Sequence, residues 1–255
     1  MMQTGRELET DARARLRRAL LWSSGLTVAL WIIPFGDRIG YPLYLLSTLV
    51  HELGHGLTAE LVGGEFSHLE VATDGSGVAF SSVTGSVQRA LVAAGGLVGP
   101  AVAALLGFAA GRRATTARIG LFAIALLTAV ATLLWVRSWV GVLVAVSVSL
   151  GCGAAALAPA RRPGVPQLVL LFLSVQLALS VFSRSEYLFT QLSTSTGGQS
   201  RSDSEAIADV LLGPYWFWGA VCGLFSVAVL LLGGRTVLRS ARGTAAPTVL
   251  ASDPA

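Results

Sequence analysis

Seven apolar runs, each close to the length of a membrane-spanning helix, occupy most of this chain. They lie at residues 19–35, 41–62, 88–110, 118–136, 138–158, 165–183 and 211–233. About 20 mostly apolar residues cross a bilayer, and in lipid such a segment must be a helix because a helix satisfies its own backbone hydrogen bonds. The junction at 135–139 contains neither Gly nor Pro, so two of the runs could form one helix. The sequence therefore predicts an all-α polytopic membrane protein with six or seven transmembrane helices.

The composition excludes a soluble globular domain and a disordered chain. Of the 255 residues, 53% are hydrophobic and only 13% are charged, and the mean hydropathy is +0.69. Soluble domains carry about 25% charged residues. The basic residues are all arginines placed between the apolar runs, which is the pattern of loops that contact anionic lipid headgroups. We therefore expect the lipid bilayer as a partner and no nucleic acid.

The basic segment 13–18 precedes the first apolar run, as in a signal peptide. No clear small-x-small cleavage site follows before Pro34, and a second run begins soon after it, so we expect an uncleaved anchor with a cytoplasmic N-terminus. A strict count of seven spans conflicts with the usual distribution of basic residues. It places Arg112, Arg113, Arg118, Arg161 and Arg162 outside the cell.

The apolar runs leave little room for a separate soluble domain, so we predict one integral membrane domain over residues 1–239. Within it, residues 63–86 alternate polar and apolar side chains around an Asp-Gly pair at 74–75, which predicts a small β-hairpin. We predict a polar loop over residues 184–204, flexible over 193–204. We predict a disordered tail over residues 240–255.

One motif in the second apolar run carries chemistry: His51-Glu52-Leu53-Gly54-His55. On a helix, residues i and i+4 point the same way and lie about 6 Å apart along the axis. His51 and His55 can therefore bind one metal ion, and two imidazoles suit Zn²⁺. Glu52 lies one step around the helix, where a carboxylate can take a proton from metal-bound water.

The depth of this motif favours a functional role. Two of the three histidines in the chain lie in it, together with a glutamate, in the middle of an apolar run. Each such group costs a few kcal/mol to insert into a bilayer, and ionisable residues within spans are functional by default. A buried polar network that only joins helices is the alternative reading.

A catalytic zinc ion needs a third protein ligand and an open position for water. Asp203 and Asp209, before and at the start of the last apolar run, are the leading candidates, although Asp203 could instead cap a helix that begins near Ser204. The remaining candidates are Glu60, Glu65, His68 and Asp74. We expect Glu60 at headgroup level, Glu65 and His68 as exposed hairpin residues, and Asp74 as a turn residue.

Three segments together resemble the site-2-protease clan of intramembrane zinc metalloproteases, and most closely its bacterial M50B-like branch. They are HELGHGLTAELVGG followed by a DGSG hairpin, then QRALVAAGGLVGPAVAALLG, and finally SDSEAIADVLLGPYWFWG. The first two cover about residues 41–110. The Gly-rich stretch from Gly95 to Pro100 resembles the close-packed segment that follows the hairpin in the clan, although small-residue helix packing also explains it.

The resemblance implies roles for individual residues. His51 and His55 become zinc ligands, Glu52 the catalytic base, and Asp203 the third ligand, with Asp209 as the alternative. Better-known members supply this aspartate from an x-D-G motif inside a span, whereas this chain has Ser202-Asp203-Ser204. The hairpin of the clan, which can receive a substrate strand by edge pairing, maps to residues 65–82.

The resemblance thus implies a zinc metalloendopeptidase that hydrolyses peptide bonds of membrane-embedded protein substrates, in a multi-pass protein of the bacterial inner membrane. The alternative is a non-catalytic multi-spanning protein with a structural zinc site. Such a site needs the two histidines but has little use for Glu52.

Overall fold

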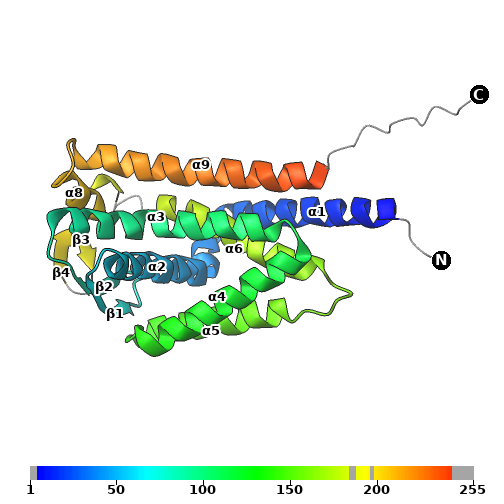
Figure 1. The fold of residues 1–255 in the computed structure, drawn as a ribbon, viewed down its shortest axis with the longest axis horizontal. Coiled ribbons are helices and arrows are strands. Elements are labelled where there is room, and N and C mark those ends of the chain that lie inside the picture. Colours follow the sequence, from blue (N-terminus) through cyan, green and yellow to red (C-terminus); the bar gives the residue numbers. More distant parts are fainter. Residues whose placement is uncertain (1–4, 184–187, 196–197, 243–255) are drawn as a thin grey trace, which may run out of the picture.

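The computed structural model describes residues 5–183, 188–195 and 198–242. Its helices are α1 (Gly5–Ile32), α2 (Gly36–Leu61), α3 (Ser86–Gly111), α4 (Ala114–Leu134), α5 (Trp139–Ala156), α6 (Gly164–Ser183), α8 (Asp203–Ala208) and α9 (Tyr215–Arg242). Its strands are β1 (Glu65–Val71), β2 (Gly77–Ser82), β3 (Leu192–Ser195) and β4 (Gly198–Arg201). The long helices form a bundle, and both hairpins and α8 gather at one end of it (Figure 1).

Five helices of the described chain are long and apolar enough to cross a membrane: α3, α4, α5, α6 and α9. Several of their large apolar side chains are exposed, including Leu127 and Leu133 of α4, as expected of surfaces that contact lipid. The polytopic helical class is therefore confirmed, whereas the predicted number of spans is not.

The first two predicted spans, 19–35 and 41–62, correspond to α1 and α2, and neither meets these criteria. The apolar part of α1 begins after Arg18, which leaves only about 14 residues or about 21 Å of helix, short of the roughly 30 Å hydrocarbon core. Helix α2 is long enough but carries Asp37, Arg38, Glu52 and Glu60.

Helix α1 runs parallel to α6. The amide of Gln176 donates to Oγ1 of Thr27 at 2.6 Å, and Oγ of Ser23 lies 3.4 Å from the carbonyl oxygen of Leu168. The residue numbers of the contacting pairs therefore rise together along both helices.

Helix α3 runs antiparallel to both α6 and α2. Gly107 and Gly111 of α3 face Ser174 and Leu171 of α6, so the residue numbers move in opposite directions. Between α3 and α2, Gly95 faces Thr58 and Gly99 faces the carbonyl of Val50.

It follows that α1 and α2 run in the same direction along the bundle, and Figure 1 shows α2 continuing toward the hairpin end. The turn between them, at Pro34 and Phe35, offsets the two helices without reversing the chain.

The predicted hairpin in 63–86 is confirmed. Strands β1 and β2 pair antiparallel from Glu65–Ser82 to Val71–Gly77. Gly75 has φ 86°, a conformation that glycine tolerates best. Two side chains of α2 hold the tip: Tyr41 donates to the carbonyl of Thr73, and Thr48 donates to the carbonyl of Gly75 at 2.8 Å.

The other edge of β1 contacts the junction between α4 and α5. The N–H of Leu69 donates to Trp135 at 2.9 Å, and the N–H of Arg137 donates back to Leu69 at 3.0 Å. The possibility that the fourth and fifth runs form one helix is thus wrong, because this junction pairs with a strand and Ser138 then caps α5.

The prediction of a flexible loop at 193–204 is also corrected. Strands β3 and β4 pair antiparallel from Leu192–Arg201 to Ser195–Gly198, and α8 begins at Asp203. Residues 184–187 and 196–197 lie outside the described residues. Helix α9 continues to Arg242, into the predicted tail, and residues 243–255 lie outside the described chain.

Candidate metal centre

Helix α2 places both histidines of the motif on one buried face. His51 is 5% exposed and Glu52 is 4% exposed. The two Nε2 atoms of His51 and His55 lie 3.1 Å apart, because residues four apart stand one above the other on a helix. The predicted convergence of the two imidazoles is present.

Asp203 completes this cluster from the other end of the chain. Its Oδ2 lies 3.1 Å from Nε2 of His51 and 3.3 Å from Nε2 of His55. The ligand atoms of the three residues all lie within 4.8 Å of one another, so together they could hold a metal ion. Glu52 is adjacent in sequence but is not a member of this group.

The cap of α8 leaves the Asp203 carboxylate available to this cluster. Ser202, rather than Asp203, is the N-cap, and its Oγ accepts from the N–H of Glu205 at 3.2 Å. The same hydroxyl contacts the carbonyl of Thr190, and the N–H of Ser202 donates to Gln191 at 2.9 Å. The capping role considered for Asp203 is therefore wrong.

Helix α3 orients His55. The Nδ1 atom of His55 lies 2.8 Å from the carbonyl oxygen of Val92, so it donates there and leaves Nε2 free to bind an ion. Gly96 of α3 makes room for the ring, because a Cβ at that position would lie 2.2 Å from Cε1 and Nε2 of His55.

Strand β2 contacts the general-base candidate. A Cβ at Gly77 would lie 2.6 Å from Oε1 of Glu52 and 2.6 Å from Cγ2 of Thr48. Because Gly77 carries no side chain, the Glu52 carboxylate can lie against the strand. The hairpin therefore borders the site directly.

Asp209, the alternative third ligand, lies outside the cluster. Its carboxylate forms an ion pair with Arg201 at the end of β4. Glu60 accepts a hydrogen bond from the N–H of Phe66 at 2.8 Å, so it anchors the start of β1.

The hairpin candidates Glu65, His68 and Asp74 are not members of the metal cluster. Glu65 is exposed, and His68 stacks on Phe80 with ring centroids 4.2 Å apart. Asp74 accepts from the N–H and the hydroxyl of Ser76 at 2.9 and 2.7 Å. These bonds stabilise its charged form and lower its pKa. The predicted turn role of Asp74 is confirmed.

A cavity of about 300 Å³ lies against the cluster. His55 and Asp203 line it together with Ser81 and Ser82 of β2 and Arg89 at the start of α3. A molecule in this cavity would contact both the metal ligands and the end of the strand.

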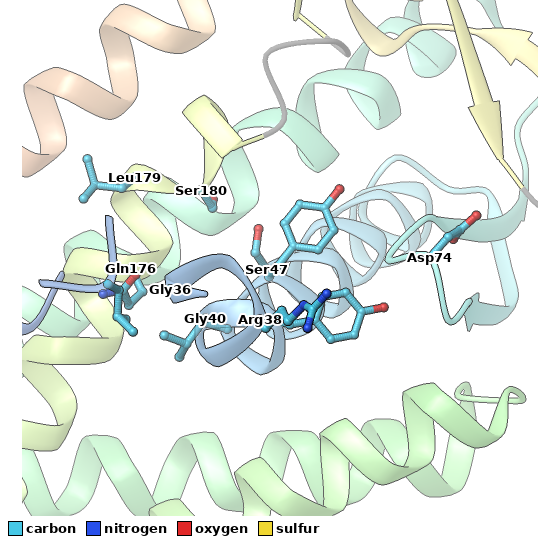
Figure 2. Close-up of a pocket in the computed structure, with 12 residues that line it drawn as sticks. Gly36, Arg38, Gly40, Ser47, Asp74, Gln176, Leu179 and Ser180 are labelled. Carbon is cyan, nitrogen blue, oxygen red and sulfur yellow. The ribbon is translucent and has the colours of Figure 1, made fainter. Parts of the chain in front are cut away.

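A second cavity, of about 560 Å³, lies between the first half of α2, the end of α6 and the hairpin tip (Figure 2). Its lining includes Arg38, Asp74 and Gln176, and also Ser47, which lies one helical turn before His51. Ser47 is 4% exposed, and its hydroxyl has no hydrogen-bond partner among the residues that the structure describes. Several polar groups therefore lie in this part of the bundle, within a cavity whose lining surface is mostly apolar.

The local sequence does not indicate the roles of Gly77, Gly96 and the carbonyl of Val92 at the site. Gly96 lies in the stretch from Gly95 to Pro100, where the small residues indicate helix packing or a segment of the clan but no contact with His55. Gly77 follows the hairpin turn and carries no local signal, because its role depends on Glu52 contacting it from another element.

The fold and the cluster define a multi-pass helical membrane protein with a candidate His-His-Asp metal centre. The family described as Peptidase M50B-like matches residues 22–233. The chain belongs to this family, within the site-2-protease M50 group, and the resemblance found in the sequence is confirmed. No curated protein and no solved structure matched the chain in the other two comparisons.

Proposed function

We propose that this protein is an intramembrane zinc metallopeptidase that hydrolyses peptide bonds of membrane-embedded proteins. The observation that carries the proposal is the convergence of His51, His55 and Asp203, with the buried Glu52 next to His51 on the same helix. Membership of a peptidase family supports it.

The donor set fits zinc. Ligands placed tetrahedrally about 2.0–2.1 Å from a zinc ion lie about 3.3–3.4 Å from one another. The three separations between Nε2 of His51, Nε2 of His55 and Oδ2 of Asp203 are 3.1, 3.1 and 3.3 Å. Two imidazoles, one carboxylate and a fourth position for water are the composition of many catalytic zinc sites.

Each residue then has a defined task. His51, His55 and Asp203 would hold the ion, which when bound makes its water acidic and polarises a carbonyl oxygen. Glu52 would accept the proton of the attacking water and deliver it to the leaving nitrogen. The hydrogen bond from His55 to Val92 keeps the ligand ring in one orientation.

The hairpin supplies a place for the substrate backbone. Strand β1 is bordered on one side by β2 and on the other by the α4–α5 junction. The far end of β2, at Ser81 and Ser82, lines the cavity with Asp203, and its near end at Gly77 contacts Glu52. A peptide paired along β2 would therefore pass the catalytic residues in extended form, which exposes its peptide bonds.

We further propose six membrane crossings. Helices α1 and α2 run in the same direction and together make one crossing, followed by α3, α4, α5, α6 and α9. Their charged junction needs a polar surrounding at membrane depth. The second cavity brings Arg38 into a common space with Asp74 and Gln176, and these groups would contribute to such a surrounding (Figure 2).

The Glu52→Gln variant tests the proposed function against a structural zinc site. Purified wild-type protein and variant would be reconstituted in liposomes with a panel of membrane-anchored reporter proteins, and cleavage and bound zinc would be measured. The variant should retain zinc and lose cleavage. Glu70→Gln is the matched control, because Glu70 is exposed on β1. Cleavage undiminished in Glu52→Gln would reject the peptidase mechanism.

A further inference from the structure

Arg89 is a charged residue beside the metal cluster that the proposed catalytic steps do not use. It lines the cavity of about 300 Å³ together with His55 and Asp203. The side chain is exposed, and its guanidinium group forms no hydrogen bond or ion pair within the ranges that the structure describes. Arg89 and Asp203 therefore face one space without pairing, so the guanidinium can bind a group that enters the cavity.

Helix α3, which orients His55, also presents Arg89 to the site. Val92 and Ala93 line the cavity with Arg89, and Gly96 lies against the His55 ring. On a helix, residues i, i+3, i+4 and i+7 share one face. Arg89 therefore belongs to the face of α3 that packs against the metal centre, two turns before Gly96.

The rest of the lining favours an anionic ligand. Ser81 and Ser82 at the end of β2 bring hydroxyl groups, which can donate hydrogen bonds. Asp203 is the one acidic side chain among the described lining residues, and its Oδ2 lies 3.1 and 3.3 Å from the two imidazoles. This carboxylate is therefore engaged by the metal cluster. Arg89 and the two serines together offer the donors and the positive charge that bind a carboxylate.

We propose that Arg89 binds an acidic side chain of the substrate close to the peptide bond that is cleaved; this inference rests on the proposed peptidase function. A peptide paired along β2 would run from Gly77, beside Glu52, to Ser81 and Ser82, beside the cavity. Because Arg89 lines the cavity at the second end only, the acidic residue lies on one side of the cleaved bond. Two metal ligands line the same cavity, so it lies within about three residues of that bond, at about 3.3 Å per residue.

An acidic residue distinguishes its substrate from most apolar segments. A charged side chain within a bilayer costs a few kcal/mol, so such residues are rare in spans. Hydrogen bonds between a guanidinium group and a carboxylate are about twice as strong as those between neutral groups. Arg89 would therefore select membrane proteins whose cleaved segment carries Glu or Asp, and would repel Lys or Arg at the same position.

Single-residue changes in a cleaved reporter protein test this specificity. After mass spectrometry has located the cleaved bond, Glu, Gln or Lys would be placed at each nearby position on both sides of it. We expect kcat/KM to be about tenfold higher with Glu than with Gln at a position on one side, and lowest with Lys. Arg89→Gln should remove most of this preference, and Arg89→Glu should reverse it in favour of Lys. Arg113→Gln is the matched control, because it removes the same charge just beyond the other end of α3 and should retain the preference.

Peptide binding separates this inference from the catalytic proposal. Zinc-loaded Glu52→Gln protein in detergent would be titrated with fluorescent, C-terminally amidated apolar peptides that differ only in one central Glu, Gln or Lys. We expect the Glu peptide to bind about tenfold more tightly than the Gln peptide, and addition of Arg89→Gln to abolish the difference. If this holds while wild-type protein cleaves no reporter, the carboxylate site stands and the peptidase proposal fails.

Other outcomes would overturn the role of Arg89. Cleavage without any preference for Glu, or a preference that Arg89→Glu leaves unchanged, would do so and leave the peptidase proposal intact. A Gln peptide with a free C-terminal carboxylate is the last arm. If this peptide alone binds more tightly through Arg89, the cavity holds the carboxylate of the product and the substrate class is wrong.

Discussion

Oδ2 of Asp203 lies 3.1 Å from Nε2 of His51, which joins a short helix near the end of the chain to the helix that carries the HExxH motif. Nothing in the local sequence around either residue encodes this contact. It depends on the packing of α8 against α3 and α9, which brings the first residue of α8 to the histidines of α2.

Replacing Asp203 should therefore remove zinc from the site. In Asp203→Ala we expect bound zinc to fall at least about tenfold at equal free zinc, because two imidazoles alone make a much weaker site. Elemental analysis of purified protein measures this. Asp209→Ala is the matched control, since Asp209 pairs with Arg201 and should leave the zinc content unchanged. The opposite pattern would transfer the third ligand to Asp209.

Gly96→Ala should disturb the site through His55. A methyl group at this position would lie 2.2 Å from the imidazole, so the ring must leave its position or α3 must move. We expect weaker zinc binding and a loss of cleavage of at least about tenfold, as small displacements of a catalytic group cost that much. Isothermal titration with zinc measures the first effect.

Gly153→Ala on α5 is the control for this substitution, because no atom of the described part of the chain lies within 4 Å of the added methyl group. Zinc affinity should be unchanged, and stability should rise by about 0.4–1 kcal/mol since alanine favours a helix over glycine. If Gly96→Ala binds zinc as tightly as wild type, the packing of α3 does not position His55.

Gly77→Ala should separate catalysis from metal binding. The added methyl group would lie 2.6 Å from Oε1 of Glu52, so the carboxylate must turn away from its place beside the strand. We expect normal zinc content and a kcat lowered by about 100-fold or more, the contribution typical of a general base. Ala79→Gly on the same strand controls for altered strand propensity, and full activity in Gly77→Ala would show that Glu52 does not act from this position.

The sequence predicted the parts of the fold that depend on local pattern. Apolar runs predicted the helices, alternation around the Asp-Gly pair predicted the hairpin, and the spacing of His51 and His55 predicted their shared face. These features arise from the periods of helix and strand, which neighbouring residues determine.

The sequence could not predict features that arise from contacts between distant segments. The break between α4 and α5 at 135–139 contains no turn residue that would predict it. The junction is instead stabilised by hydrogen bonds to Leu69 of β1, which is distant in the sequence. The direction of α2 depends on how its glycines pack against α3. Asp203 could be selected from the family resemblance, but its position beside the histidines required the whole fold.

Removing the metal should destabilise the protein. The cluster ties α8 to α2 through Asp203, so an ion bound only by the folded state stabilises it by about 2.7 kcal/mol when free zinc is a hundredfold above Kd. We expect a chelator to lower the Tm of wild-type protein in detergent and added zinc to restore it.

In His51→Ala the chelator should have little effect, because the site is already incomplete. Glu52→Gln should respond like wild type, since Glu52 is not a ligand. A Tm that is insensitive to zinc in wild-type protein would show that the three residues do not hold an ion in the folded state.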